Sequence, residues 1–337
     1  MTRAIAARLI GALPVLFLVT LLIFTLLRLA PGDAADLLVP DDASEADIAA
    51  ARARWGLDRP ILEQYLAFLG NIVRLDFGVS YRYGEDVFTL IAMRLPATLE
   101  LSIVSLLMGS LMAVPLGILA ALRRGKFLDG VVSVIAIAGV SAPTFWMAIL
   151  MVLFLSAELN LFPSSGRLPF GSGLEQVTGF LIVDSILQGR LDLLRMVLSF
   201  MFLPAFTLAL NMMGIIARIT RSSVIDVGQE EFVTTAVSKG LPRQRIVRRH
   251  LLPNAMIPIT TVIGLELGTL ISGSIIVEVV FSWPGLGTLL YQAISTRDIP
   301  LVTGVVVIYT ALFILINVLI DITYFLIDPR VRAAQAG

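Results

Sequence analysis

Residues Gln229 to Pro258 read QEEFVTTAVSKGLPRQRIVRRHLLPNAMIP, a polar and strongly basic stretch between two long apolar runs. In its first half, four apolar residues share one face of a short helix: Phe232, Val233, Ala236 and Val237. Gly240 and Pro242 interrupt the helical pattern, and the second half carries Arg243, Arg245, Arg248 and Arg249. We therefore expect two short helices joined at a Gly-Leu-Pro bend, which would present a docking surface for a soluble partner beside a membrane.

The composition indicates a chain that is surrounded mainly by lipid. Of the 337 residues, 57% are hydrophobic and only 15% are charged, and a soluble core cannot hide that much apolar surface. The formal net charge is zero, which gives no argument for nucleic-acid binding. The chain has no cysteine, so disulfides and thiolate chemistry are excluded, and its single histidine, His250, excludes a His-rich metal site.

The first apolar run extends from about Leu9 to Leu27 and follows Arg3 and Arg8. At about 1.5 Å per residue it can cross most of a hydrocarbon core of about 30 Å. A cleaved signal peptide is the alternative, but the run exceeds a usual signal h-region and reaches Arg28 without a small-residue cleavage site. We predict a retained transmembrane helix over residues 1–30, with its N-terminus in the cytoplasm.

Residues 31–95 are polar and form a predicted extracytoplasmic subdomain in which acidic residues outnumber arginines. Ser44 and Asp47 resemble a capping box, so a helix should begin there and stop near Gly56. A second helix should follow Pro60. An apolar stripe on that helix is expected to pack on its neighbour or on the membrane: Ile61, Leu62, Tyr65, Leu66, Leu69, Ile72 and Val73.

Five further apolar runs complete a prediction of six transmembrane helices. They are Pro96–Leu122, Val131–Ala157, Met196–Ala217, Ile257–Phe281 and Pro300–Ile327. The predicted fold class is an all-α polytopic membrane protein with a small helical extracytoplasmic subdomain between the first two spans. Residues 96–327 would form a five-helix core that includes the cytoplasmic loop 218–256, and residues 328–337 would be a cytoplasmic tail.

Basic residues concentrate in the segments that this topology places on one side of the membrane. They are Arg3, Arg8, Arg123, Arg124, Lys126, Arg218, Arg221, Lys239, Arg243, Arg245, Arg248, Arg249, Arg330 and Arg332. The short loops on the other side hold Arg167, Arg190, Arg195 and Arg297. The positive-inside rule therefore predicts that both termini and the stretch Gln229–Pro258 are cytoplasmic, and that residues 31–95 lie outside.

Three acidic residues attract attention because they lie within or near the ends of predicted spans: Glu266, Glu278 and Asp321. A charge at membrane depth is costly unless it faces water or a partner, so each is a candidate for a functional site. A structural role is the alternative, and it is stronger for Glu278 and Asp321, which lie near span ends. Glu266 lies deeper, among glycines and serines that permit either close helix packing or a polar path.

The sequence gives no support to an enzymatic function. It contains no P-loop, dinucleotide fingerprint, nucleophile elbow or paired-His helix motif. His250 lies in the basic loop rather than inside the membrane, where a membrane protease would need its base. Any energy coupling must therefore come from another protein or from an ion gradient.

The opening stretch resembles the EAA loop of ABC importer permeases, in which a Glu-Ala-Ala triplet is followed by a glycine and later by Ile-x-Leu-Pro. Gly240 matches the glycine, and Leu252-Pro253 match the end of the motif. The triplet reads Thr234-Thr235-Ala236, and His250 replaces the isoleucine, so the motif is kept in part.

Other segments extend the resemblance to the dipeptide/oligopeptide/nickel permease family, over essentially the whole chain. They are EFVTTAVSKGL followed by RHLLPNAMIP, EVVFSWPGLG at Glu278–Gly287, LRLAPGD ending at Asp33, RLPATLEL at Arg94–Leu101 and SAPTFW at Ser141–Trp146. The resemblance implies a type I ABC importer half-channel in the bacterial inner membrane. It also implies a homologous second permease, two cytoplasmic ATPases and an extracytoplasmic substrate-binding protein as partners.

Under this resemblance the chain is not an enzyme and carries no cofactor, because ATP and magnesium would bind the ATPase partners. The residues expected to couple to those ATPases are Glu231, Phe232, Val233, Ala236, Val237, Lys239, Gly240, Arg243 and Pro253. Those expected to line the translocation path are Asn211, Glu266, Ser272 and Glu278. The expected cargo is a dipeptide or an oligopeptide, with nickel chelates and sugar or opine conjugates as alternatives.

The rival hypothesis is a secondary transporter or channel driven by an ion gradient. It would use Glu266, Glu278 or Asp321 as ion relays. A membrane hydrolase is a more distant alternative. Strict dependence of uptake on ATP would separate the importer from both.

Overall fold

The computed structural model describes residues 2–29, 44–54, 58–169 and 171–327. Within these ranges the regular elements are helices, apart from one isolated bridge between Val79 and Asp86. The predicted all-α class is therefore confirmed. The chain forms two compact units, one built from Leu95–Thr288 with Leu315–Gly337 and the other from Thr2–Arg94 with Leu289–Ile314.

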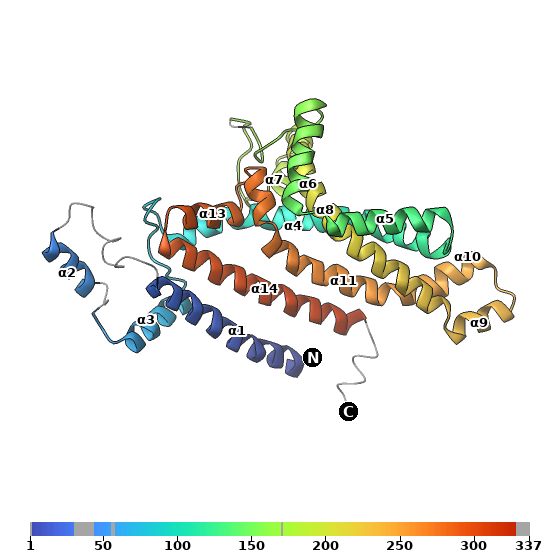
Figure 1. Ribbon diagram of the computed structural model, residues 1–337, viewed down its shortest axis with the longest axis horizontal. Helices are drawn as coiled ribbons and strands as arrows, with labels where there is room; N and C mark the ends of the chain where they lie inside the picture. Colours follow the sequence, from blue (N-terminus) through green and yellow to red (C-terminus); the bar gives the residue numbers. More distant parts are fainter. Residues whose placement is uncertain (1, 30–43, 55–57, 170, 328–337) are drawn as a thin grey trace. The chain divides into compact units, whose positions relative to one another are not determined.

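The helices follow one another along the colour ramp of Figure 1. They are α1 (Thr2–Leu29), α2 (Glu45–Arg54), α3 (Ile61–Val73), α4 (Val87–Leu122), α5 (Phe127–Ser141), α6 (Thr144–Met151), the π-helical turn η2 (Val152–Glu158), α7 (Leu181–Leu187), α8 (Leu191–Gly228), α9 (Glu231–Ser238), α10 (Arg243–Ile246), the π-helical turn η3 (Val247–Leu251), α11 (Leu252–Gly273), α12 (Ile275–Val280), α13 (Leu286–Ser295) and α14 (Ile299–Ile327).

The larger unit is organised around α8, which packs against α5, α6, α7 and α11 (Figure 1). Its core is apolar and includes the fully buried side chains of Leu101, Leu203 and Trp283. Close packing of α5 on α8 depends on Gly214, since a Cβ at this position would collide with the carbonyl oxygen of Ala136. Small residues thus let the backbones of neighbouring helices approach each other, as is common inside membranes.

Several helices are long and apolar enough to cross a membrane. Among the described residues there are four, Val87–Leu122, Leu191–Gly228, Arg243–Ile271 and Ile299–Ile320, or five if a bent pair counts as one span. The predicted first span corresponds to α1, of which Leu13–Thr25 is a shorter apolar helix by the same measure. The polytopic membrane fold is confirmed, while the number of six spans stays a prediction.

The bent pair corrects the prediction of one continuous span over Val131–Ala157. The chain turns by 104° between α5 and the helix formed by α6 and η2. The break lies at Ala142, which has an extended backbone (φ −77°, ψ 129°) and precedes Pro143. A residue before proline disfavours the helical conformation, and proline cannot donate the next helical hydrogen bond, so the helix ends here.

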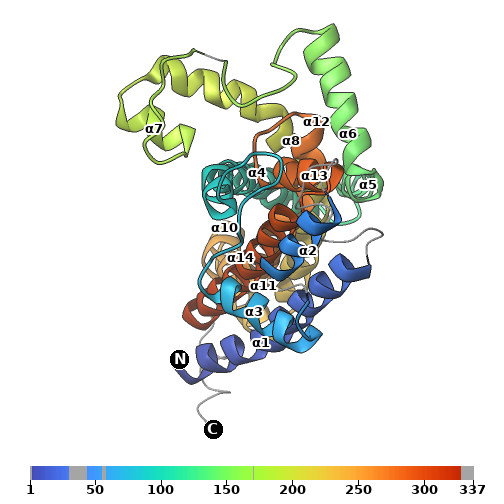
Figure 2. The same cartoon turned by 90° about the vertical axis from the view of Figure 1, so that its left-hand side faces the viewer.

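In the smaller unit, α2 begins directly after Ser44 and α3 directly after Pro60, as the sequence predicts. The expected stop at Gly56 lies outside the described residues. α3 lies against α1 (Figure 2). Tyr65 of α3 is buried in this contact. The predicted boundaries of residues 31–95 as a subdomain, and of 328–337 as a tail, stay predictions; the compact unit that contains α2 and α3 also includes Leu289–Ile314.

Candidate functional site

The stretch Gln229–Pro258 forms a helical hairpin, in which α9 ends in a Schellman motif. The N–H of Gly240 donates to the carbonyl of Val237 at 2.9 Å, and the N–H of Leu241 donates to the carbonyl of Ala236 at 3.3 Å. Gly240 has φ +71°, a conformation that only glycine adopts without strain. Pro242 then precedes α10, so the predicted pair of short helices joined at a Gly-Leu-Pro bend is confirmed.

An apolar cluster holds the two arms of the hairpin together. Val233 and Ala236 from α9 are buried against Ile246 from α10, with Leu241 packed beside them. Ala236 and Leu241 occupy the two positions that make the hydrophobic contact of a Schellman motif. The hairpin is therefore a folded unit with its own small core.

This cluster corrects the prediction that four apolar residues of α9 face a partner together. Val233 is 7% and Ala236 is 5% exposed, because both fill the interior of the hairpin. Phe232 and Val237 remain 41% and 60% exposed, so only these two present apolar surface outward. Val233 and Ala236 fix α9 on α10, and their part in coupling stays a prediction.

Four other residues predicted for this site, three charged ones and a proline, lie on the surface of the hairpin or its stem. Glu231 begins α9, Lys239 follows its last residue, Arg243 begins α10, and Pro253 is the second residue of α11. All four are exposed, and none of the charged ones forms an ion pair with another described residue. Arg245, Arg248 and Arg249 are exposed too. The hairpin therefore offers unpaired positive charge around two apolar side chains.

The hairpin is joined directly to the ends of two long helices, whereas the sequence predicts a loop over residues 218–256. Residues up to Gly228 belong to α8, and residues from Leu252 belong to α11, so both flanks of the predicted loop are helical. Val224 of α8 is buried with Leu251 and Ala255 in a second apolar cluster. A force on the hairpin would therefore act directly on α8 and α11 (Figure 1).

The residues predicted to line a path lie apart from the hairpin. Asn211 is half-buried in α8 and donates from Nδ2 to Oγ1 of Thr144 at 3.3 Å. Glu266 is half-buried in α11, and its Oε2 accepts from Oγ1 of Thr269 at 3.1 Å. Ser272 lies in α11 and Asp321 in α14, and the side chains of both are outside the described part of the structure. Their path-lining or relay roles stay predictions.

Glu278 is completely buried in α12, and its carboxylate is saturated with hydrogen bonds. Oε1 accepts from Oγ1 of Thr98 at 2.8 Å and from Oγ of Ser274 at 3.2 Å. Oε2 accepts from the backbone N–H groups of Gly287 at 2.8 Å and Thr288 at 3.2 Å. Glu278 thus clamps the turn before α13 to α4, and this arrangement favours the structural alternative for this residue.

Two buried or partly buried ion pairs were not predicted from the sequence. Arg167 and Glu100 form a buried pair, and Arg167 also donates to the carbonyl of Gly179 at 2.8 Å. Arg221 donates to the two carboxylate oxygens of Asp129, from Nε at 2.5 Å and from Nη2 at 2.9 Å. The signal for the first pair was present, because Glu100 is an acidic residue inside a predicted span, where a partner is expected.

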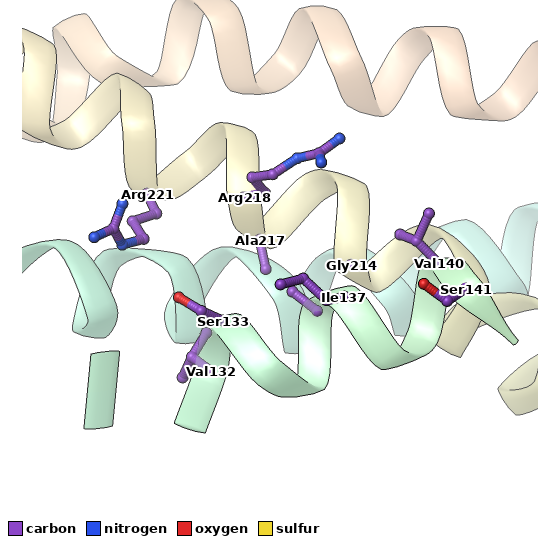
Figure 3. Close-up of a pocket in the computed structure, with 10 residues that line it drawn as sticks. Val132, Ser133, Ile137, Val140, Ser141, Gly214, Ala217, Arg218 and Arg221 are labelled. Carbon is purple, nitrogen blue, oxygen red and sulfur yellow. The ribbon is translucent and has the colours of Figure 1, made fainter. Parts of the chain in front are cut away.

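A groove of about 330 Å³ runs between α5 and α8, beside the Arg221–Asp129 pair. Figure 3 shows that Ser133, Ile137 and Ser141 line it from α5, while Gly214 and Ala217 line it from α8. Arg218 extends from α8 in a direction away from α5. The walls are mainly apolar, and among the described residues no group of three or more Asp, Glu or His side chains could hold a metal ion.

Comparison with known proteins identifies two family models in this chain. Residues 113–333 match the model described as binding-protein-dependent transport system inner membrane component. Residues 1–102 match the N-terminal model of such membrane components. Together they match residues 1–102 and 113–333, a range that includes the hairpin.

Curated relatives match over nearly the full length. The chain is 39% identical to the di/tripeptide transport system permease protein DppB of Pseudomonas aeruginosa, over 98% of this chain and 99% of the relative. It is 38% identical to the probable D,D-dipeptide transport system permease protein DdpB of Escherichia coli, over 93% and 92% of the two chains. The dipeptide transport system permease protein DppB of Escherichia coli is 36% identical, over 98% and 99%.

Solved structures show the same fold. An inward-facing structure of the MetNI methionine ABC transporter matches with a TM-score of 0.54 and 20% identity, over 71% of this chain and 96% of that chain. An amino acid ABC transporter with histidines matches with a TM-score of 0.52 and 17% identity, over 70% and 93%. By its family models and its curated relatives, the chain belongs to the binding-protein-dependent transport system inner membrane components, the ABC importer permeases.

Proposed function

We propose that this chain is the permease subunit of an ABC importer that moves dipeptides or oligopeptides into the cytoplasm. The peptide cargo is supported by the names of relatives that share 36% to 39% of its residues over nearly their whole length. The observation that carries the coupling role is the hairpin of α9 and α10, which is rigidly packed within itself and attached to two long helices.

The surface of the hairpin fits a contact with soluble ATPase subunits. Phe232 and Val237 offer an apolar contact, and the surrounding exposed cations would meet acidic groups of the partner. ATP and magnesium would bind those partners and not this chain. Closure of an ATPase dimer would displace the hairpin and tilt α8 and α11, which would switch the access of the path between the two sides of the membrane.

The remaining partners follow from the family. A homologous second permease would complete the channel, and a substrate-binding protein would deliver the peptide from outside. This arrangement requires that the hairpin and both termini face the cytoplasm of a bacterial inner membrane, as the distribution of basic residues predicts. The chain itself would perform no catalysis.

The test is peptide uptake into proteoliposomes that contain the chain together with its co-expressed permease, ATPase and binding-protein partners. We expect uptake of a labelled dipeptide to require ATP and the binding protein, and to stop when a catalytic residue of the ATPase is changed. Uptake that follows a proton gradient without ATP would support the secondary transporter instead. Uptake of methionine or nickel chelates but not of peptides would disprove the cargo and leave the importer role intact.

A further inference from the structure

Part of the apolar surface of helix α3 stays exposed after the helix packs on α1. Tyr65 is buried against α1, where its ring makes edge contacts with Phe17 and Phe24. Its hydroxyl lies 3.0 Å from Oγ1 of Thr20. These contacts account for only one strip of the apolar face of α3.

A second strip lies beside the first and is open. Leu62, Leu66 and Val73 are 69%, 58% and 83% exposed. Their spacing places them on one line along the helix, with the partly buried Leu69 between Leu66 and Val73. Asn71 is exposed on the opposite side and Glu63 is exposed about a quarter of a turn from the strip, so α3 is amphipathic even after its contact with α1 is subtracted.

The open strip continues an exposed apolar surface on α1. Phe17, whose ring contacts Tyr65, is itself 50% exposed, and Leu13 and Leu21 on the same face of α1 are 60% and 38% exposed. A family of inner membrane components places α1 in lipid. The surroundings of Leu13, Phe17 and Leu21 therefore also reach α3, which lies against α1 in both views (Figures 1 and 2).

The length and depth of α3 decide how it meets the membrane. Its 13 residues measure about 20 Å, which is too short for a hydrocarbon core of about 30 Å. Thr20 lies about 13 Å from the end of α1 at Leu29, which is within one leaflet. An interfacial helix buries its apolar face about 5–10 Å deep. The side chain of Tyr65 spans much of the remaining distance between that depth and Thr20.

We propose that α3 is an interfacial helix that lies in the lipid at the end of α1, with Leu62, Leu66 and Val73 among the acyl chains and Glu63 and Asn71 toward water. Its ends carry Arg59 and Arg74, which can extend to the headgroups. Asp58 and Asp76 offset these two charges, so binding is driven by apolar burial and needs no anionic lipid. The proposal depends on residence in the membrane and not on the peptide cargo.

The absence of cysteine makes a direct test simple, because one introduced cysteine gives one label in this chain. Leu62→Cys, Leu66→Cys and Val73→Cys carry a nitroxide on the open strip, and Glu63→Cys and Asn71→Cys are matched controls on the same helix. All five positions are exposed, so the label does not disturb the contact with α1. Each variant is assembled with its partner subunits in liposomes and must retain wild-type uptake.

Collision with oxygen, which concentrates in lipid, is compared with collision with a water-soluble nickel chelate. We expect oxygen to relax the nitroxide more strongly than the nickel chelate on the open strip, and the nickel chelate to relax it more strongly at Glu63 and Asn71. Neither result should change when phosphatidylglycerol is omitted from the liposomes. Nickel access at Leu62, Leu66 and Val73 would show that the strip faces water. Low access of both reagents there would show that a partner subunit covers it, and either result would overturn the proposal.

Discussion

Substitution of Gly240 is the sharpest test of the hairpin, because the structure separates backbone strain from side-chain bulk. At φ +71°, an L-residue other than Asn or Asp costs about 1–2 kcal/mol. A Cβ added at this position would meet no atom within 4 Å, so Ala and larger residues should pay the same backbone cost and no more. A penalty of this size lowers the equilibrium constant for forming the closed hairpin by a factor of about 5–30.

We therefore expect Gly240→Ala and Gly240→Leu to lower peptide uptake per ATP hydrolysed to a similar extent, while insertion of the chain in the membrane is unchanged. Gly240→Asn should retain most of the coupling, because Asn tolerates the left-handed conformation. Gly189→Ala is the matched control, since Gly189 has φ +65° and no atom within 4 Å of its added Cβ but lies before α8, away from the hairpin. The assay is uptake and ATP hydrolysis measured in the same proteoliposomes.

Two outcomes would refute this reasoning. If Gly240→Ala couples as well as the unmodified chain, the Schellman motif has no role in coupling. If Gly240→Leu is far more damaging than Gly240→Ala, side-chain volume at the partner surface decides the effect and backbone strain does not. The behaviour of Gly240→Asn separates these cases, because it adds volume without the full strain.

Five further substitutions have distinct expected results. Phe232→Ala should weaken assembly with the ATPase subunits in pull-down experiments while the chain keeps its melting temperature, whereas Val233→Asp should lower the melting temperature because it places a charge in the hairpin core. Glu278→Ala leaves the buried hydroxyl of Thr98 and the buried N–H of Gly287 without an acceptor, each costing about 1–3 kcal/mol, and should lower the melting temperature far more than Glu266→Ala, which loses a single side-chain partner. Arg221→Ala should cost about 1 kcal/mol, because its side chain is 31% exposed and solvent screens the pair; a double-mutant cycle with Asp129→Ala checks that the loss belongs to the pair. Gly214→Val should separate α5 from α8 and reduce thermal stability, and an unchanged melting curve would contradict the close contact with Ala136.

The bend between α9 and α10 could be predicted because its cause is local. Gly240 and Pro242 are strong helix-ending residues, and their spacing is visible in the sequence. The break between α5 and α6 is equally local, since Pro143 follows Ala142, yet the apolar run hides it. Hydropathy measures how much of a segment suits lipid, and it does not report whether the backbone continues in one direction.

The distribution of burial within the hairpin could not be predicted. Periodicity places Phe232, Val233, Ala236 and Val237 on one face of the helix. It does not say which of them turn toward the second arm of the hairpin. That choice depends on Ile246 and Leu241, which approach only after the chain has reversed. The same limit applies to Arg167, whose acidic partner Glu100 is 67 positions away in the sequence.

The π-helical turn η3 joins α10 to α11 without interrupting the helix, which continues from Arg243 to Ile271. A π turn holds about one residue more than an α turn, and in a helix of 3.6 residues per turn one residue corresponds to a rotation of about 100°. Val247–Leu251 therefore act as a spacer that sets the angular phase between the arginine-bearing surface and every side chain of α11. A relative that lacks this turn would align with a one-residue gap here, and the gap would turn its Glu266 counterpart toward a different neighbour.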